Sequence, residues 1–179
     1  MSRRTRIALI VPLVLVALYF GVTTFIRWRV DQLIEHAVGS PLPTFSLADR
    51  TGRTWTRDDL VGHRAVLHFF RSKCGACDAE APEIRALEQA LPADTVLLHV
   101  MTDRVLDFDP SWAGPTIEKK AYARPILMAD QAFVDAFHSV TWSNVTPVTY
   151  VVDAAGVVRY GLRGMQTKAV IEAALDAVR

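Results

Sequence analysis

Residues 65–82 read AVLHFFRSKCGACDAEAP and contain the only two cysteines of the 179-residue chain, Cys74 and Cys77. The stretch begins with an almost uninterrupted apolar run, residues 65–70, which is typical of a strand covered on both faces of a sheet. From Cys77 to Leu91 the apolar residues recur at helical spacing. The sequence therefore predicts that the two cysteines lie where a buried strand passes into a helix.

A second buried strand is predicted directly after this helix, at residues 95–101. Such a strand–helix–strand unit implies a parallel pair with a right-handed crossover. Two alternating, β-branched segments joined by a turn that ends in glycine indicate a hairpin near the C-terminus, at residues 148–152 and 157–160. The other predicted elements are strands at 45–47, 53–56 and 125–128, a helical turn at 57–60, and helices at 117–123, 131–137 and 168–178. Together these elements predict an α/β fold.

An uncharged segment of about 20 residues precedes the domain, at residues 7–26. As a helix it is long enough to cross the roughly 30 Å hydrocarbon core of a bilayer. The run is long for a cleavable signal peptide, and no cleavage site of small residues follows it closely, so we expect an uncleaved signal anchor. The basic flank is stronger before the segment (Arg3, Arg4, Arg6) than after it (Arg27, Arg29), which favours a cytoplasmic N-terminus.

The chain is accordingly expected to have four parts: a cytoplasmic N-terminus (1–6), a transmembrane signal anchor (7–26), a juxtamembrane linker (27–40) and a folded domain (41–179). The folded domain would lie on the extracytoplasmic, periplasmic side of a single-pass inner-membrane protein, where disulfides persist. The formal net charge is only +1, so no charge excess points to nucleic acid, and we expect no nucleic-acid partner.

The Cys-x-x-Cys spacing places the first sulfur at the N-terminus of the predicted helix. Free backbone N–H groups and the positive end of the helix dipole favour a thiolate there, at Cys74. Arg71 and Lys73 are close enough in sequence to add to this effect.

Three other interpretations of the pair compete with redox chemistry. A zinc site needs four ligands, and the histidines are scattered without ligand spacing, so we expect no metal; they are His36, His63, His68, His99 and His138. His68 and His99 fall within predicted strands and are expected to be packed or hydrogen-bonded. Inert core thiols are the second alternative. A permanent structural disulfide is the third, although so small a loop would stabilise the fold little.

The stretch resembles the active site of the thioredoxin superfamily, and more narrowly its membrane-anchored TlpA/ResA-like branch. The features that carry the resemblance are an apolar strand before Cys74-x-x-Cys77, Glu80-x-Pro82, Val145-Thr146-Pro147 before a strand, and Asp153-Ala-Ala-Gly156 in the following hairpin. It covers about residues 41–178. It implies a thioredoxin-like fold, with a mixed central sheet flanked by helices and an N-terminal β-hairpin extension.

The resemblance also implies roles for single residues. Cys74 would be the attacking thiol and Cys77 the resolving thiol. Pro147, after Thr146, matches a cis-proline that faces the cysteines and lets the neighbouring backbone bind a partner chain, although from sequence alone it could be a strand-entry proline. Glu80 matches an acidic residue that exchanges protons with the cysteines or tunes them; the alternative is a solvated glutamate of the first helical turn.

The chain departs from the family pattern around the cysteines, since Lys73 stands where tryptophan is usual and Gly75-Ala76 lacks the frequent proline. No redox potential is therefore carried over. Residues 103–125 also depart from the pattern, and Trp112 among them is expected in the core or facing a partner.

The resulting hypothesis is a membrane-tethered oxidoreductase that reduces disulfides of partner proteins, in cytochrome c maturation or a similar process. It would need no dissociable cofactor beyond the cysteine pair and would receive electrons from a membrane donor. A disulfide oxidase or isomerase is the alternative within the same chemistry. A copper-binding assembly factor, with thiols as soft ligands, is the alternative of another class. A peroxiredoxin is disfavoured because no Thr-x-x-Cys precedes the pair.

Overall fold

The computed structural model describes residues 3–138 and 145–178. Residues 1–2 of the predicted cytoplasmic segment, and the last residue of the predicted domain, lie outside this range. The chain divides into two compact units, Met1–Gln32 and Leu33–Arg179.

Helix α1 runs from Arg3 to Glu35 and contains Pro12. Its Val11–Glu35 part has a mean hydropathy of 1.7 in its most apolar window, so by length and composition alone it could cross a membrane. Many of its large apolar side chains are exposed, among them Leu13, Tyr19 and Phe20.

A five-stranded mixed sheet forms the centre of the second unit. Its strand order is β5 (Ile126–Met128), β4 (Thr95–Met101), β3 (Arg64–Phe70), β6 (Val148–Val152), β7 (Val158–Arg163). β3 is parallel to β4 and antiparallel to β6, so the strand–helix–strand prediction and the hairpin prediction are both confirmed. The continuous apolar run of residues 65–70 is explained by the position of β3 in the middle of the sheet.

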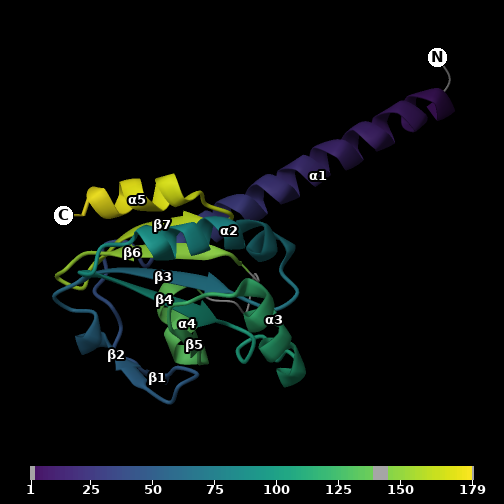
Figure 1. Cartoon of the computed structure of the whole chain (residues 1–179). Helices are drawn as coiled ribbons and strands as arrows, with labels where there is room; N and C mark the ends of the chain where they lie inside the picture. The colour runs from purple at the N-terminus through teal and green to yellow at the C-terminus, as the bar shows by residue number, and fades with distance from the viewer. Residues whose placement is uncertain (1–2, 139–144, 179) are drawn as a thin grey trace. The chain divides into compact units, whose positions relative to one another are not determined.

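Both faces of the sheet are covered. On one face, Val66 of β3 packs with apolar residues of α2 (Gly75–Ala90) and α5 (Lys168–Asp176). On the other, Phe69 contacts Phe133 and Phe137 of α4 (Gln131–Phe137). Figure 1 shows α2 and α5 together on one side of the sheet and α4 on the opposite side. Successive residues of β3 therefore face α2 and α4 in turn, as the period of a strand requires.

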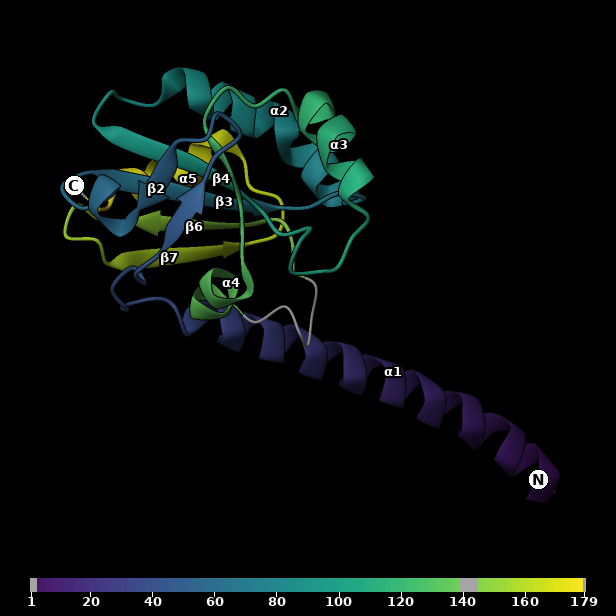
Figure 2. The same ribbon diagram turned by 90° about the horizontal axis from the view of Figure 1, so that it is seen from below.

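The predicted N-terminal hairpin is formed by β1 (Ser46–Ala48) and β2 (Thr54–Thr56), which pair antiparallel. The short helix η1 (Arg57–Asp59) follows it. Figure 2 shows the hairpin and α4 in front of the sheet and α5 behind it.

The segment before β5 differs from the sequence-based prediction. A short helix η2 (Pro110–Trp112) leads into α3, which spans Ala113–Lys120 instead of residues 117–123. Ala121 takes a left-handed conformation, with φ of 52°, and this conformation ends the helix before its predicted boundary.

Candidate active site

The two cysteines form a disulfide at the N-terminus of α2, with an S–S distance of 2.05 Å. Cys74 is the N-cap residue, and its Sγ accepts the backbone N–H of Cys77 at 3.1 Å. Cys77 is fully buried, whereas Cys74 keeps a 4% exposed fraction. Cys74 is thus the more exposed of the two cysteines, although both side chains are buried.

The segment before β6 lies directly against Cys74. The Thr146–Pro147 peptide bond is cis, so this conformational prediction is confirmed. Both the carbonyl oxygen and the hydroxyl Oγ1 of Thr146 lie 3.7 Å from the Cys74 sulfur. The structure therefore brings together residues that are 72 positions apart in the sequence.

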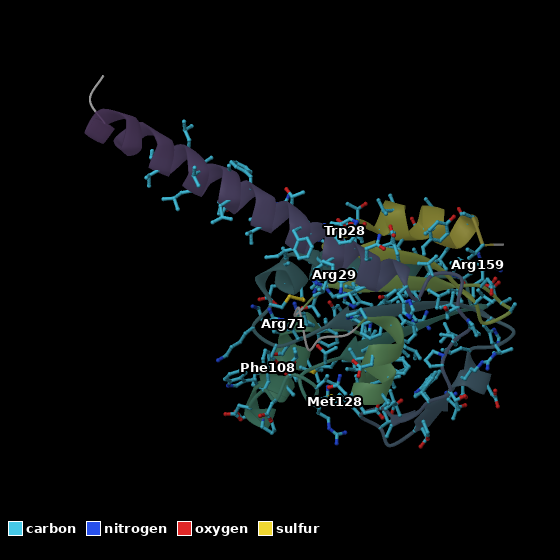
Figure 3. The ribbon with its side chains drawn as sticks, turned by 180° about the vertical axis from the view of Figure 1, so that it is seen from behind. Trp28, Arg29, Arg71, Phe108, Met128 and Arg159 are labelled. Atoms are coloured by element: carbon cyan, nitrogen blue, oxygen red, sulfur yellow. A yellow bond between two sulfur atoms is a disulfide. The ribbon has the colours of Figure 1, made fainter. Side chains whose placement is uncertain are left out.

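Arg71 fastens this segment to the cysteine loop. Its Nε donates to Thr146 Oγ1 at 3.0 Å, and its Nη1 donates to the carbonyl oxygens of Ser72 and Lys73 at 3.0 and 3.1 Å. Its guanidinium carbon lies 5.6 Å from the ring centroid of Phe108, and Figure 3 shows both side chains at the end of the domain that carries the disulfide. Because Arg71 occupies the hydroxyl oxygen, the Thr146 O–H is free to point at the sulfur.

Lys73 makes a contact that was not predicted from the sequence. Its ammonium lies 3.1 Å from the ring centroid of Trp112, a cation–π contact that directs the charge to the ring. Its backbone has φ of 51°, a left-handed conformation that costs a non-glycine residue roughly 1–2 kcal/mol. Trp112 was expected only in the core or facing a partner. In the structure its ring contacts Lys73, the residue before Cys74.

Ser72 is held by a second set of contacts from the far side of the loop. Its backbone N–H donates to Asp103 Oδ1 at 2.8 Å, and its hydroxyl lies 2.8 Å from the hydroxyl of Thr116. Asp103 and Ser72 are both buried. Residues 103–116, which the sequence left without a role, therefore fix the loop that precedes the cysteines.

Glu80 lies in α2 after Cys77 and is only 1% exposed. It follows Cys77 by three residues on α2, so the two side chains share one face of the helix. Its Oε1 accepts the backbone N–H of Gln166 at 2.8 Å, and its Oε2 lies 3.1 Å from Nε2 of His68. The alternative of a solvated first-turn glutamate was therefore wrong, because α2 turns this residue toward the sheet.

A buried chain of polar side chains continues from Glu80 across two strands. Nδ1 of His68 lies 3.1 Å from Nδ1 of His99, and Nε2 of His99 lies 2.8 Å from Oε1 of Glu88. Both imidazoles are fully buried, which confirms that they are packed and hydrogen-bonded. Sequence reasoning did not foresee that they would connect Glu80 to Glu88.

The charge states at the Glu88 end follow from its surroundings. Burial lowers the pKa of His99 to about 4, although the hydrogen bond to Glu88 opposes this effect. Burial raises the pKa of Glu88, but hydrogen bonds from His99 and from the backbone N–H groups of Arg124 and Ala123 outweigh it, and the pKa falls below its ordinary value. At neutral pH this end therefore holds a neutral imidazole and a carboxylate.

The described part of the chain contains no group of three or more His, Cys, Asp or Glu residues arranged to hold a metal ion. The two histidines nearest to the cysteine helix are already engaged with carboxylates and with each other.

Comparisons with known proteins agree with this geometry. The family model described as AhpC/TSA family matches residues 38–161, more than half of the chain. The chain belongs to the AhpC/TSA family. Among curated relatives, the thiol-disulfide oxidoreductase ResA of Geobacillus kaustophilus is 25% identical over 100% of this chain and 99% of its own length. The thioredoxin-like protein YneN of Bacillus subtilis is also 25% identical, over 77% of this chain and 78% of its own.

Solved structures show the fold of this AhpC/TSA-family chain. A thiol:disulfide interchange protein of the thioredoxin family from Chlorobium tepidum superposes with a TM-score of 0.66 at 20% identity, covering 79% of this chain and 97% of its own. StoA from Bacillus subtilis gives a TM-score of 0.62 at 17% identity, covering 76% and 97%. The predicted thioredoxin-like fold is confirmed.

Proposed function

We propose that the chain is a thiol–disulfide oxidoreductase in which Cys74 attacks and Cys77 resolves, with proteins as the partners. The observation that carries this proposal is the disulfide at the N-terminus of α2, with its outer sulfur 3.7 Å from the residue before a cis-proline. ResA, which aligns with the full length of this chain, is named a thiol-disulfide oxidoreductase. No dissociable cofactor is needed, because the cysteine pair carries both electrons.

The catalytic cycle follows from the positions of the two sulfurs. In the reduced protein, the Cys74 thiolate attacks a partner's disulfide, so that a mixed disulfide forms and the partner's second sulfur leaves. The buried Cys77 then attacks Cys74 and releases the reduced partner. The N–H of Cys77 and the hydroxyl of Thr146 both reach the Cys74 sulfur and would stabilise its thiolate.

Thr146 and Pro147 are proposed to bind the partner. Thr146 is only half-buried, and its backbone lies beside the reactive sulfur. An extended partner chain could pair with this backbone in the manner of an added strand, which would place its own sulfur in line with Cys74.

Glu80 is proposed to exchange protons with Cys77, because both are buried on one face of α2. A buried thiol cannot readily release its proton to water, and a carboxyl group one helical turn away is the nearest titratable side chain along the helix face.

Reduction of partner proteins, as in cytochrome c maturation, is the direction that the family resemblance favours. The segment between the cysteines, Gly75-Ala76, also lacks the histidine found there in the strongest oxidants of the superfamily. A redox potential of about −270 mV would support a reductant, and one of about −120 mV would instead support the oxidase alternative.

The apolar helix α1 supports a further proposal, that the chain is a single-pass inner-membrane protein with its catalytic domain in the periplasm and a membrane electron donor. The test is the fractionation of cells that express the full chain, followed by protease treatment of intact spheroplasts. Digestion of the domain outside the cytoplasmic membrane is expected. Recovery in the soluble fraction, or protection from protease, would contradict it.

The oxidoreductase activity itself is tested by reduction of insulin disulfides. The wild type should accelerate it, and Cys74→Ser should abolish the acceleration. Full activity of Cys74→Ser would refute the mechanism. Stoichiometric binding of Cu(I) by a chain without exchange activity would instead favour a copper-binding assembly factor.

A further inference from the structure

The buried chain Glu80–His68–His99–Glu88 reaches from the cysteine helix to the far end of the same helix. His68 and His99 are direct neighbours in the register of β3 and β4, and both point at the face that α2 covers. Glu80 and Glu88 come from α2 itself, eight residues apart. All four side chains are buried, with exposed fractions between 0 and 7%.

The three contacts of this chain need three protons. Each contact joins two nitrogen or oxygen atoms at 2.8 to 3.1 Å, so each must hold one hydrogen to avoid two facing lone pairs. Two neutral imidazoles supply only two hydrogens, and ionised carboxylates supply none. All three contacts between Glu80, His68, His99 and Glu88 can therefore be hydrogen bonds only if one proton is present in addition to the two that the neutral imidazoles carry.

The Glu88 end decides where this additional proton lies. Glu88 accepts the backbone N–H of Arg124 at 2.8 Å and that of Ala123 at 3.0 Å, so it acts as an acceptor and Nε2 of His99 must donate to it. A neutral His99 then has a bare Nδ1, which accepts a hydrogen from Nδ1 of His68. Nε2 of His68, the nitrogen that faces Glu80, consequently carries no hydrogen. The additional proton must therefore lie in the contact between Nε2 of His68 and Oε2 of Glu80.

Other titratable groups lie around the hydrogen-bonded residues Glu80, His68, His99 and Glu88. The Tyr122 ring stacks on His99 at 4.1 Å, and burial raises its pKa, so it stays neutral. Arg124 and Lys120 place positive charge near His99 and Glu80, respectively. Arg85 and Asp78 of α2 also act on Tyr122.

We propose that His99 and Glu88 are positioning residues that hold one proton between Glu80 and His68 in the oxidised protein, and that this proton passes to Cys77 when the disulfide is opened. The inference rests on the proposed function and adds residues to it. When a donor thiolate attacks Cys74, a new S–S bond forms, the Cys74–Cys77 bond breaks, and the electron pair leaves on the Cys77 sulfur. The proton from the Glu80–His68 pair then makes Cys77 a thiol. In the reverse step the thiol returns the proton to the pair as Cys77 attacks the mixed disulfide.

Nitrogen NMR tests the proton positions directly. Two-bond ¹H–¹⁵N correlation spectra of the ¹⁵N-histidine-labelled full chain in detergent report which ring nitrogens carry hydrogen. In the oxidised protein, His99 should be neutral and protonated on Nε2, and His68 should carry a hydrogen on Nδ1. Reduction with excess dithiothreitol should change the signals of His68 and leave the tautomer of His99 unchanged.

His138 provides an internal control, because it is buried on the other face of the sheet and contacts Tyr150 instead of this chain. Its signals should be the same in both redox states. A His99 protonated on Nδ1, or His68 signals that do not change on reduction, would overturn the inference.

Kinetics test whether Glu88 acts through the proton. The rate at which dithiothreitol reduces Cys74–Cys77, divided by the thiolate concentration, should fall above the pH at which the Glu80–His68 pair loses its proton. Glu88→Gln removes the negative charge that retains this proton, so the midpoint of the fall should move to lower pH. Glu88→Asp keeps a carboxylate and should restore most of the difference.

Glu83→Gln is the matched control, because Glu83 lies on the same helix and accepts the backbone N–H of Lys168 but is not part of the chain. A merely structural role of Glu88 would change the rate by the same factor at every pH. An unmoved midpoint in Glu88→Gln, or an equal movement in Glu83→Gln, would refute the positioning role.

If Glu88→Gln does not fold, the NMR spectra of the wild type still decide the inference. Both measurements use a small thiol, so a failure to exchange disulfides with proteins would refute only the proposed function.

Discussion

Acidification should destabilise the domain through histidines that are buried in their neutral form, and His138 allows the clearest test. Its Nδ1 lies 3.0 Å from the hydroxyl of Tyr150, which itself donates to the carbonyl oxygen of Phe137 at 3.2 Å. Nδ1 of His138 is therefore the donor, and Nε2 is the atom that would take up a proton. Nε2 has no hydrogen-bond partner among the described residues, and the Phe69 ring lies 5.0 Å from the imidazole.

Burial lowers the pKa of His138 to about 4, against about 6.5 in an unfolded chain. The unfolded state therefore binds the proton first as the pH falls, so stability is complete above about pH 6.5 and declines toward about pH 4. At about 1.36 kcal/mol for each pH unit, the full loss is about 3 kcal/mol. The pKa of His99 is lowered to the same value, so on unfolding at about pH 5 these two histidines should together bind about two protons from the solution.

The assay is urea unfolding of the full chain in mild detergent, followed by tryptophan fluorescence at several pH values. His138→Gln should reduce the proton uptake by about one and flatten the pH dependence accordingly. His63→Gln is the control, because His63 is exposed and should leave the slope unchanged. The same slope in wild type and His138→Gln, or an equal decrease in His63→Gln, would refute the reasoning.

Two further predictions concern the loop around Cys74. Thr146→Val removes a hydroxyl that stabilises the Cys74 thiolate by about 1 kcal/mol. Less of Cys74 is then ionised, but each thiolate is more nucleophilic, so alkylation of reduced Cys74 should slow only about twofold. Thr149→Val on the following strand should leave this rate unchanged. At Lys73, replacement by alanine loses the contact with Trp112 and keeps the left-handed backbone, while replacement by glycine also relieves the backbone. The glycine variant should therefore be the more stable of the two by about 1 kcal/mol in thermal unfolding, and equal stabilities would contradict the assignment of strain.

The fold and the cysteine site could be predicted because their signals are local. The apolar run of β3, the helical spacing of α2 and the glycine-ended turn at Gly156 each occupy a short segment of sequence. The resemblance then connected the distant Pro147 to the cysteines.

The buried proton chain could not be predicted in the same way, because it depends on strand register. His68 and His99 are each the fifth residue of their strands, and only the parallel pairing of β3 and β4 makes them neighbours. Within one strand, a single polar residue in an apolar run indicates no partner. An alignment of the two strands by their first residues would have indicated the contact.

The contacts of Arg71 and Lys73 escaped prediction for other reasons. Arg71 and Thr146 are separated by 75 positions, and no periodic pattern links them. Lys73 has a left-handed backbone conformation that glycine normally adopts. Because lysine is not a typical turn residue, the sequence did not indicate the turn that brings the Lys73 ammonium to the Trp112 ring.

The central claim is that Cys74 and Cys77 exchange disulfides with partner proteins in separate roles, and trapping tests it most directly. Cys77→Ala leaves Cys74 able to attack and removes the thiol that resolves the mixed disulfide. In cells, this full-length variant should accumulate mixed disulfides that disappear on treatment with dithiothreitol, while Cys74→Ala with Cys77 intact should accumulate none. If Cys77→Ala forms no such adducts, or if the Cys74→Ala variant forms as many, the assigned roles are contradicted.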